Sequence, residues 1–175
     1  IMNTLYPIFR YSFTPEEIKR TFDIVSRLQT NRLVCEHGDL SPWNITYDKR
    51  NIGVIDWEVA RPSGFPGTDL VLFLTYLNFT FENAWENRNF AESYAKILDP
   101  GTHAGSIFKE CIEIYSRELE LTESDMDSIR LLTWLGQLHK RIGRYYKSTQ
   151  NLKLPLDLDE EITLDLWNVE LEKSR

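Results

Sequence analysis

The stretch CEHGDLSPWNITYDKRNIGVIDWE, residues 35–58, combines a short polar loop with two apolar strand patterns. The strands flank the polar residues DKRN, which predict a turn, so the segment is expected to form a β-hairpin. A hairpin brings its open ends together, which places Asn44 at the start of the first strand near Asp56 at the end of the second. The loop before the hairpin carries Asp39 and is expected beside both residues.

These three residue types suit phosphoryl transfer from a nucleotide. The reaction needs a group that orients the acceptor hydroxyl and accepts its proton, together with hard oxygen ligands that hold Mg²⁺ against the phosphates. Asp39 lies on a loop, where a carboxylate can reach a hydroxyl, while Asn44 and Asp56 offer an amide oxygen and a carboxylate. Each residue alone is weak evidence, because Asp and Asn are common in turns and at strand starts. Their joint spacing carries the prediction.

Three motifs then occur in order: HGDLSPWNI at 37–45, GVIDWEVA at 53–60 and GFPGTDL at 64–70. Together they resemble the pattern of the aminoglycoside phosphotransferase and choline kinase superfamily, whose members are distant relatives of protein kinases. The resemblance covers residues 37–70. It implies an α+β, predominantly helical fold, the C-terminal lobe of a protein-kinase-like fold, in which a small β-hairpin carries the site.

The resemblance also implies a role for each matching residue. Asp39 resembles the catalytic base, Asn44 the amide ligand of one Mg²⁺, and Asp56 the carboxylate that bridges Mg²⁺ to the phosphates of ATP. His37 resembles the histidine that braces the loop, and Asp69 resembles the Asp that begins the next helix and ties down the catalytic loop. A carboxylate in the first turn of a helix is also favoured by the helix dipole, which is compatible with that role.

Two neighbouring residues are candidates for the acceptor side of the site. Trp43 is bulkier than the small residue often found there in the family, and it either shapes the acceptor side or covers the hairpin. Glu58 either faces the acceptor or is solvated. The chain departs from the family pattern in having three residues between Ala60 and Gly64, where two are common, and in having Phe65 where Asp is frequent.

Composition favours one soluble domain, residues 1–175. The chain has 42% hydrophobic residues and a net charge of −7, with no basic tract, which argues against a nucleic-acid polymer or an anionic membrane as partner. Its longest apolar run, residues 70–81, is too short to span a bilayer, and the N-terminus has no signal-peptide pattern. We therefore expect a cytoplasmic protein in which Cys35 and Cys111 are buried free thiols.

Periodicity and capping signals predict the remaining elements. Thr14-Pro-Glu-Glu17 and Thr122 with Asp125 are capping boxes that begin two of the helices. The expected strands are 32–36, 44–47 and 52–56, with an irregular segment at 59–67 and a connecting loop at 153–159. The expected helices are 15–29, 68–80, 89–98, 104–120, 123–148 and 159–173. The long helix 123–148 carries an apolar stripe expected in the core, made of Met126, Ile129, Leu132, Leu135, Leu138 and Ile142.

A kinase of this class needs a nucleotide lobe with a phosphate-covering loop, a Lys on the phosphates and a Glu partner for that Lys. Only 36 residues precede His37, and no Walker-type motif occurs. The expectation is therefore a C-terminal lobe alone, inactive in isolation, with an exposed face through which it could dimerise.

The leading hypothesis is a small-molecule kinase that transfers the γ-phosphate of ATP to a hydroxyl of an amino sugar, an amino alcohol such as choline or ethanolamine, or a related metabolite. Acidic residues of the helical region would attract a cationic acceptor, although acidic helix faces are usually just solvated. The alternative is a catalytically silent, kinase-like interaction or binding module.

Overall fold

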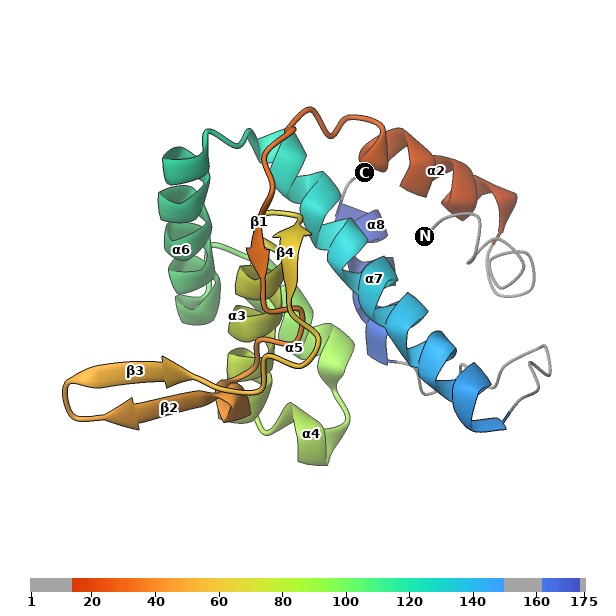
Figure 1. Cartoon of the computed structure of the whole chain (residues 1–175). Helices are drawn as coiled ribbons and strands as arrows, with labels where there is room; N and C mark the ends of the chain where they lie inside the picture. The colour runs from red at the N-terminus through yellow and green to blue at the C-terminus, as the bar shows by residue number, and fades with distance from the viewer. Residues whose placement is uncertain (1–13, 150–161, 174–175) are drawn as a thin grey trace.

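The fold is mostly helical, with two small sheets at one side (Figure 1). The computed structural model describes residues 14–149 and 162–173. Its helices are α2 (Pro15–Val25), α3 (Thr68–Phe81), α4 (Ala84–Asn87), α5 (Phe90–Leu98), α6 (His103–Leu119), α7 (Glu123–Thr149) and α8 (Ile162–Lys173), and its strands are β1 (Val34–Glu36), β2 (Ile45–Asp48), β3 (Asn51–Val54) and β4 (Arg61–Gly64), with a 3-10 turn η1 (Pro42–Asn44). The prediction of a predominantly helical α+β fold is confirmed.

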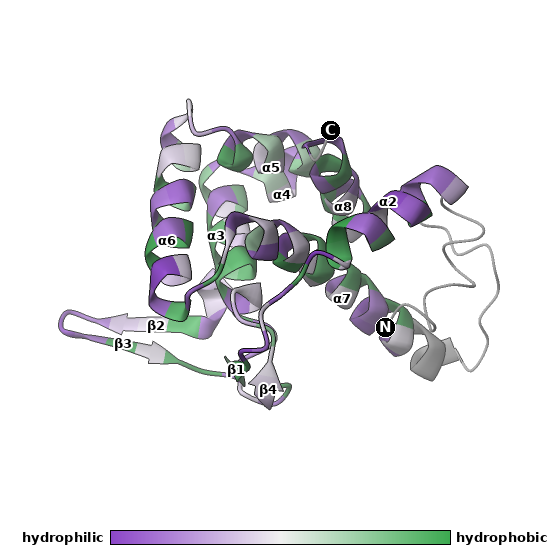
Figure 2. Ribbon diagram, turned by 90° about the horizontal axis from the view of Figure 1, so that it is seen from above, coloured by the Kyte–Doolittle hydropathy of each residue, from purple (hydrophilic) through white to green (hydrophobic). Residues whose placement is uncertain are grey.

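The predicted hairpin is formed by β2 and β3. The strands pair antiparallel in regular register from Ile45 opposite Val54 to Asp48 opposite Asn51. Seen from above, this hairpin extends away from the helical body (Figure 2). Its open end, rather than its turn, therefore lies against the body, and that end carries Asn44 on one side and Ile55 on the other.

A second sheet was missed by the sequence analysis. Residues 59–67 were expected to be irregular, but 61–64 form β4, which pairs antiparallel with β1 across a bulge. Pro62 suggested a turn, yet proline is tolerated in a two-stranded sheet because each strand has a free edge. Gly64 is needed at its position, because a Cβ atom there would overlap the Cβ atom of Glu36 on the paired strand.

Long-range contacts shift several predicted boundaries. Helix α2 ends at Val25 rather than at residue 29, because the backbone N–H groups of Gln29 and Thr30 donate to the Asp125 carboxylate, at 2.8 and 3.2 Å. The short helix α4 was not predicted. The expected loop 153–159 and the first residues of the expected helix 159–173 lie outside the described residues.

Helix α7 forms the centre of the core. It crosses the molecule beside α2, α3 and α8 (Figure 1). Of its apolar stripe, Met126, Ile129, Leu135 and Leu138 are buried, and Leu132 and Ile142 are partly buried, which confirms the predicted core face.

A buried polar network joins α5, α7 and α8. The guanidinium of Arg130 donates to both carboxylate oxygens of Glu170, at 2.9 and 3.2 Å, and the indole N–H of Trp134 donates to the hydroxyl of Tyr94 at 2.9 Å. Tyr94 in turn donates to Glu170. Burial, followed by the Glu170 charge, raises the pKa of Tyr94 well above its ordinary value. A buried charge that keeps its partner avoids the large cost of an unpaired ion, so this network fixes how α8 packs.

The cysteines are free, as predicted, but they are not both buried. Cys35 is exposed and Cys111 is partly buried. Cys35 was expected in a buried strand, yet β1 belongs to a sheet of only two strands, and its side chain lies on the open face. No helix in the described part of the chain is both long enough and apolar enough to cross a bilayer.

The carboxylate of Asp125 joins the start of α7 to the end of α2. It accepts from the N–H and the hydroxyl of Thr122, which completes the predicted capping box, and from two N–H groups of the segment after α2. Burial alone would raise the pKa of Asp125, but these hydrogen bonds outweigh it and hold that pKa below its usual range.

We expect Asp125→Ala to lower the free energy of unfolding by about 2–3 kcal/mol, because it removes a cap and leaves backbone donors unpaired. Since its pKa is lower in the folded state, the carboxylate stabilises the fold above about pH 4, and this contribution is lost as the pH falls through the folded-state pKa. Urea unfolding at neutral and acidic pH measures both effects. Glu123→Ala, which changes an exposed carboxylate in the same turn, is the control. An equal effect of the two substitutions would contradict the assignment.

Candidate functional site

The loop at His37–Asp39 is held by one carboxylate. Asp69, in the first turn of α3, accepts the N–H of His37 through one oxygen at 2.6 Å and the N–H of Gly38 through the other at 2.8 Å. Gly38 has a φ of +81°, a conformation that glycine adopts without strain. The sequence placed Asp69 at a helix start, and the structure brings its carboxylate to the loop 31 residues earlier.

The imidazole of His37 braces the same loop from inside. This buried ring places its Nε2 2.9 Å from the carbonyl oxygen of Ile55 and lies 4.8 Å from the ring of Trp57. A carbonyl only accepts, so Nε2 carries the proton and Nδ1 accepts the N–H of Asp39 at 3.4 Å. His37 therefore connects the loop to the end of the hairpin, as a structural group.

Asn44 connects the loop to the hairpin from the other side. The side-chain nitrogen of Asn44 donates to the backbone carbonyl oxygen of Asp39 at 2.9 Å. The backbone carbonyl oxygen of Asn44 accepts the N–H of Ile55 at 3.0 Å. The side chain is buried. The amide nitrogen is thus occupied, while its oxygen, the atom that a magnesium ion would coordinate, receives no hydrogen bond from the described residues.

Asp56 lies at the end of the hairpin in an unusual conformation. Its φ is +64°, in the left-handed region where residues other than glycine are uncommon. Its neighbours hold it there, because Ile55 is bonded to His37 and Asn44, and the indole N–H of Trp57 donates to the carbonyl of Val54 at 2.8 Å. Such local strain persists where surrounding structure determines it and is frequent at functional sites. The Asp56 side chain itself is exposed.

This donor set fits Mg²⁺. The ion takes oxygen ligands and usually keeps several waters, so proteins commonly supply only one or two carboxylates and leave the rest to water and phosphate. An amide oxygen at Asn44 and a carboxylate at Asp56 match that demand. Within the described ranges there is no group of three or more His, Cys, Asp or Glu side chains that would hold a metal by themselves.

Lys140 holds the same loop from α7 and was not identified from the sequence. Its ammonium group, on α7, donates to the carbonyl oxygen of Gly38 at 2.6 Å. Both backbone groups of Gly38 are therefore held, the N–H by Asp69 and the carbonyl by Lys140. Burial, and then the charge of Arg61, lower the pKa of Lys140. A single Lys on an amphipathic helix, 102 residues from its partner, gives no sequence signal.

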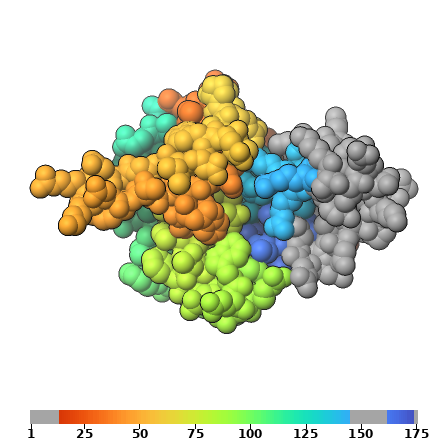
Figure 3. Space-filling view, turned by 60° about the horizontal axis from the view of Figure 1, so that its bottom comes forward, coloured from red at the N-terminus to blue at the C-terminus, as the bar shows by residue number. Residues whose placement is uncertain are grey.

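A cavity of about 520 Å³ opens beside Asp39. The C-terminal part of α7, drawn in blue, reaches the surface next to the segment that carries the motif residues (Figure 3). The residues that line the cavity are Gly38, Asp39, Glu58, Val59, Arg61, His139, Lys140, Gly143 and Arg144. The two acceptor-side candidates separate here: Glu58 lines the cavity, while Trp43 does not and instead stacks on Tyr76, with ring centroids 5.7 Å apart.

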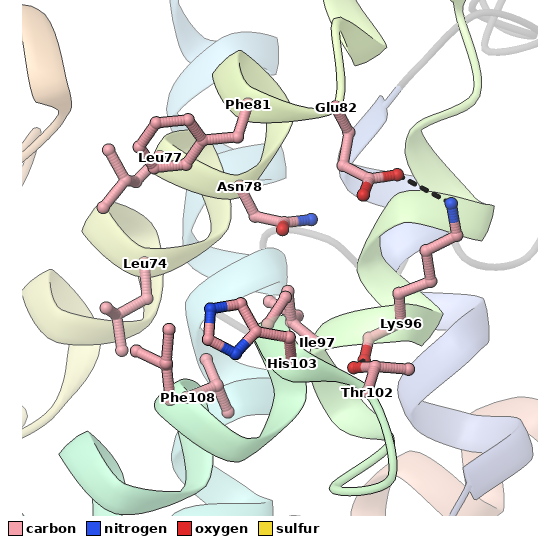
Figure 4. Close-up of a pocket in the computed structure, with 12 residues that line it drawn as sticks. Leu74, Leu77, Asn78, Phe81, Glu82, Lys96, Ile97, Thr102, His103 and Phe108 are labelled. Atoms are coloured by element: carbon pink, nitrogen blue, oxygen red, sulfur yellow. Dashed lines mark hydrogen bonds and ion pairs between the residues drawn. The ribbon is translucent and has the colours of Figure 1, made fainter.

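Another pocket, of about 570 Å³, lies between α3, α5 and α6 (Figure 4). Leu74, Leu77 and Phe108 give it an apolar wall, and Glu82 and Lys96 form an ion pair at its edge, 2.7 Å long. None of the motif residues lines this pocket, so the cavity beside Asp39 is the relevant one for the chemistry.

The motif residues lie within a segment that matches a known protein family. The sequence profile of the phosphotransferase enzyme family matches residues 13–105, more than half of the chain, and this span includes every motif residue described above. The chain belongs to the phosphotransferase enzyme family, whose fold is kinase-like. No curated protein and no solved structure gives a significant match. Lys140 and Arg144 lie outside the matched span.

The Asp69 contacts predict a local effect of substitution. Asp69→Ala leaves two buried N–H groups without acceptors, and we expect it to lower the free energy of unfolding by about 2–4 kcal/mol. Amide hydrogen exchange at His37 and Gly38 should accelerate more than exchange in the β2–β3 ladder. Asp69→Asn keeps one accepting oxygen, so its free energy of unfolding and its exchange rates should lie between those of the parent protein and of Asp69→Ala.

Asp48→Ala, on the exposed turn of the hairpin, is the matched control. Unchanged exchange at residues 37 and 38 in Asp69→Ala would show that the carboxylate does not hold the loop.

Proposed function

We propose that this chain is the catalytic lobe of a small-molecule kinase that transfers the γ-phosphate of ATP to a hydroxyl group. One observation carries the proposal: the loop of Asp39 is fixed by Asp69, His37 and Lys140, yet no described residue donates a hydrogen bond to the Asp39 carboxylate. That carboxylate is partly exposed beside a cavity. A base whose backbone is held and whose oxygens are free is suited to accept a proton from a bound hydroxyl.

Each residue then has a distinct task. Asp39 orients the acceptor hydroxyl and accepts its proton as the oxygen attacks the phosphorus atom. The Asn44 amide oxygen and the Asp56 carboxylate would hold Mg²⁺, which neutralises charge on the transferring phosphoryl group when it is bound. His37 and Asp69 position the loop and need not touch either substrate. Amino sugars, amino alcohols and related metabolites remain the acceptors that the family resemblance favours.

The surface around the site supports a covering nucleotide lobe. Eight of the thirteen large hydrophobic side chains that are exposed among the described residues fall within residues 33–65; these are Leu33, Trp43, Tyr47, Ile52, Ile55, Trp57, Val59 and Phe65. Such a concentration of exposed apolar groups is typical of an interaction surface. We propose that the nucleotide-binding lobe packs against it, and that in its absence the chain would associate with itself through the same face.

Asp39→Asn is the direct test of the base. In a protein that joins this chain to its nucleotide lobe, we expect kcat to fall about 10²–10⁴-fold with little change in the KM for ATP, because the base acts in the chemical step. Phosphate transfer from labelled ATP to a panel of hydroxylated acceptors measures it. Asp48→Asn makes the same charge change at the far end of the hairpin and should retain activity. Full activity in Asp39→Asn would exclude this residue as the base.

The 175-residue chain alone should transfer no measurable phosphate, since it would lack the Lys and the covering loop that bind the phosphates. Robust turnover by this chain, abolished by Asp39→Asn, would disprove the need for a second lobe. The coding sequence before Ile1 is an independent check: a β-rich segment carrying a Lys and a Glu there would support the kinase, whereas a native start codon near Met2 would favour a catalytically silent module.

A further inference from the structure

Basic side chains gather around the cavity beside Asp39. Arg61 comes from β4, and Lys140 and Arg144 come from α7, four residues apart and therefore on one face of the helix. The opposite charges on the lining are those of Asp39 and Glu58, so three cations face two carboxylates. The lining is net positive in a chain whose net charge is −7.

The three basic side chains differ in their contacts with the rest of the protein. Burial and the charge of Arg61 lower the pKa of Lys140, while the charges of Glu36, Asp39 and Asp69 raise it. The ammonium of Lys140 is bonded to Gly38, but the guanidinium groups of Arg61 and Arg144 form no ion pair or hydrogen bond with any described residue. The guanidinium groups of Arg61 and Arg144 therefore remain available to an anion bound in the cavity.

A glycine, Gly143, forms part of the wall of the cavity. A Cβ atom at Gly143, one residue before Arg144, would meet nothing within 4 Å. Glycine in a helix costs up to about 1 kcal/mol relative to alanine, and no close packing requires it at this position. Because Gly143 lines the cavity, the absence of a side chain there leaves space free at its wall.

We propose that this cavity is an anion subsite for the acceptor, so that the hydroxylated substrate carries a carboxylate or phosphate group held by Arg61 and Arg144 while its hydroxyl reaches Asp39. This inference rests on the proposed function and narrows its acceptor class. It adds an anionic group to the amino sugars, amino alcohols and related metabolites named there, and the acidic residues of the helical region, which could attract a cationic acceptor, do not line this cavity. Guanidinium groups bind carboxylate and phosphate through paired hydrogen bonds, which gives such a subsite geometric selectivity.

The first experiment measures anion binding by the chain itself. Inorganic phosphate and malonate are titrated by calorimetry, with glycerol and ethanolamine as neutral and cationic comparisons. We expect binding of both anions and neither comparison compound, with a roughly three- to tenfold weaker Kd in Arg61→Gln or Arg144→Gln. Arg27→Gln removes an exposed arginine after α2 and should change nothing. An equal loss of anion affinity in Arg27→Gln, or no anion binding by the parent chain, would overturn the proposal of an anion subsite.

A second variant tests the free volume of the cavity rather than its positive charge. Gly143→Leu keeps both arginines and replaces glycine with a good helix former, so the fold should be retained or stabilised. The longer side chain would narrow the cavity, and we expect anion binding to weaken at least tenfold. Unweakened binding in this variant, with a thermal midpoint at or above the parent value, would contradict the placement of the anion in the cavity.

The source of the anion is settled in the protein that carries its nucleotide lobe. If the acceptor supplies it, Arg144→Gln raises the KM for a hydroxy acid or a phosphorylated polyol and leaves the KM for ATP unchanged. A raised KM for ATP alone would assign the subsite to the nucleotide phosphates and overturn the acceptor assignment. Anion binding by the chain, together with no transfer to any acceptor by the protein that carries the nucleotide lobe, would defeat the proposed function and with it the acceptor assignment, while the anion subsite itself would stand.

Discussion

The carboxylate of Asp69 is the interaction on which the site depends. It receives two consecutive backbone N–H groups, those of His37 and Gly38, one on each oxygen. Hydrogen bonds to a charged acceptor are stronger than neutral ones, and two of them in parallel fix an orientation as well as a position. The residue that follows them in the chain is Asp39. The direction in which that carboxylate leaves the loop is therefore set by the first turn of α3.

The scaffold and the site meet along α7. Its first turn binds the end of α2 through Asp125, its middle fills the core, and its late part reaches Gly38 through Lys140. One rigid helix thus relates the packing of the helical body to the loop of Asp39. A substitution that shifts α7 in the core would therefore also displace the loop of Asp39, even where the substituted residue contacts none of the motif residues.

Local sequence signals predicted much of this arrangement. The turn DKRN predicted the hairpin, two capping boxes predicted helix starts, and periodicity predicted the buried face of α7. Each of these signals depends only on residues that are close in the sequence. The pairing of β4 with β1 was missed since Pro62 and Gly64 favour a turn locally, and Glu36 explains the glycine only in three dimensions. Lys140 and Arg144 were missed for the same reason: their position beside Asp39 follows from how α7 packs, which no short pattern encodes.

We propose that the loop and the hairpin together bind a metal–nucleotide complex. Paramagnetic Mn²⁺ in place of Mg²⁺, added with a non-hydrolysable ATP analogue to the isotope-labelled chain, reports even weak binding through broadening of nearby NMR signals. We expect broadening centred on Asp39, Asn44 and Asp56, abolished by Asp56→Asn and unchanged by Asp48→Asn. Broadening centred elsewhere, or equal broadening in the Asp56→Asn chain, would contradict it.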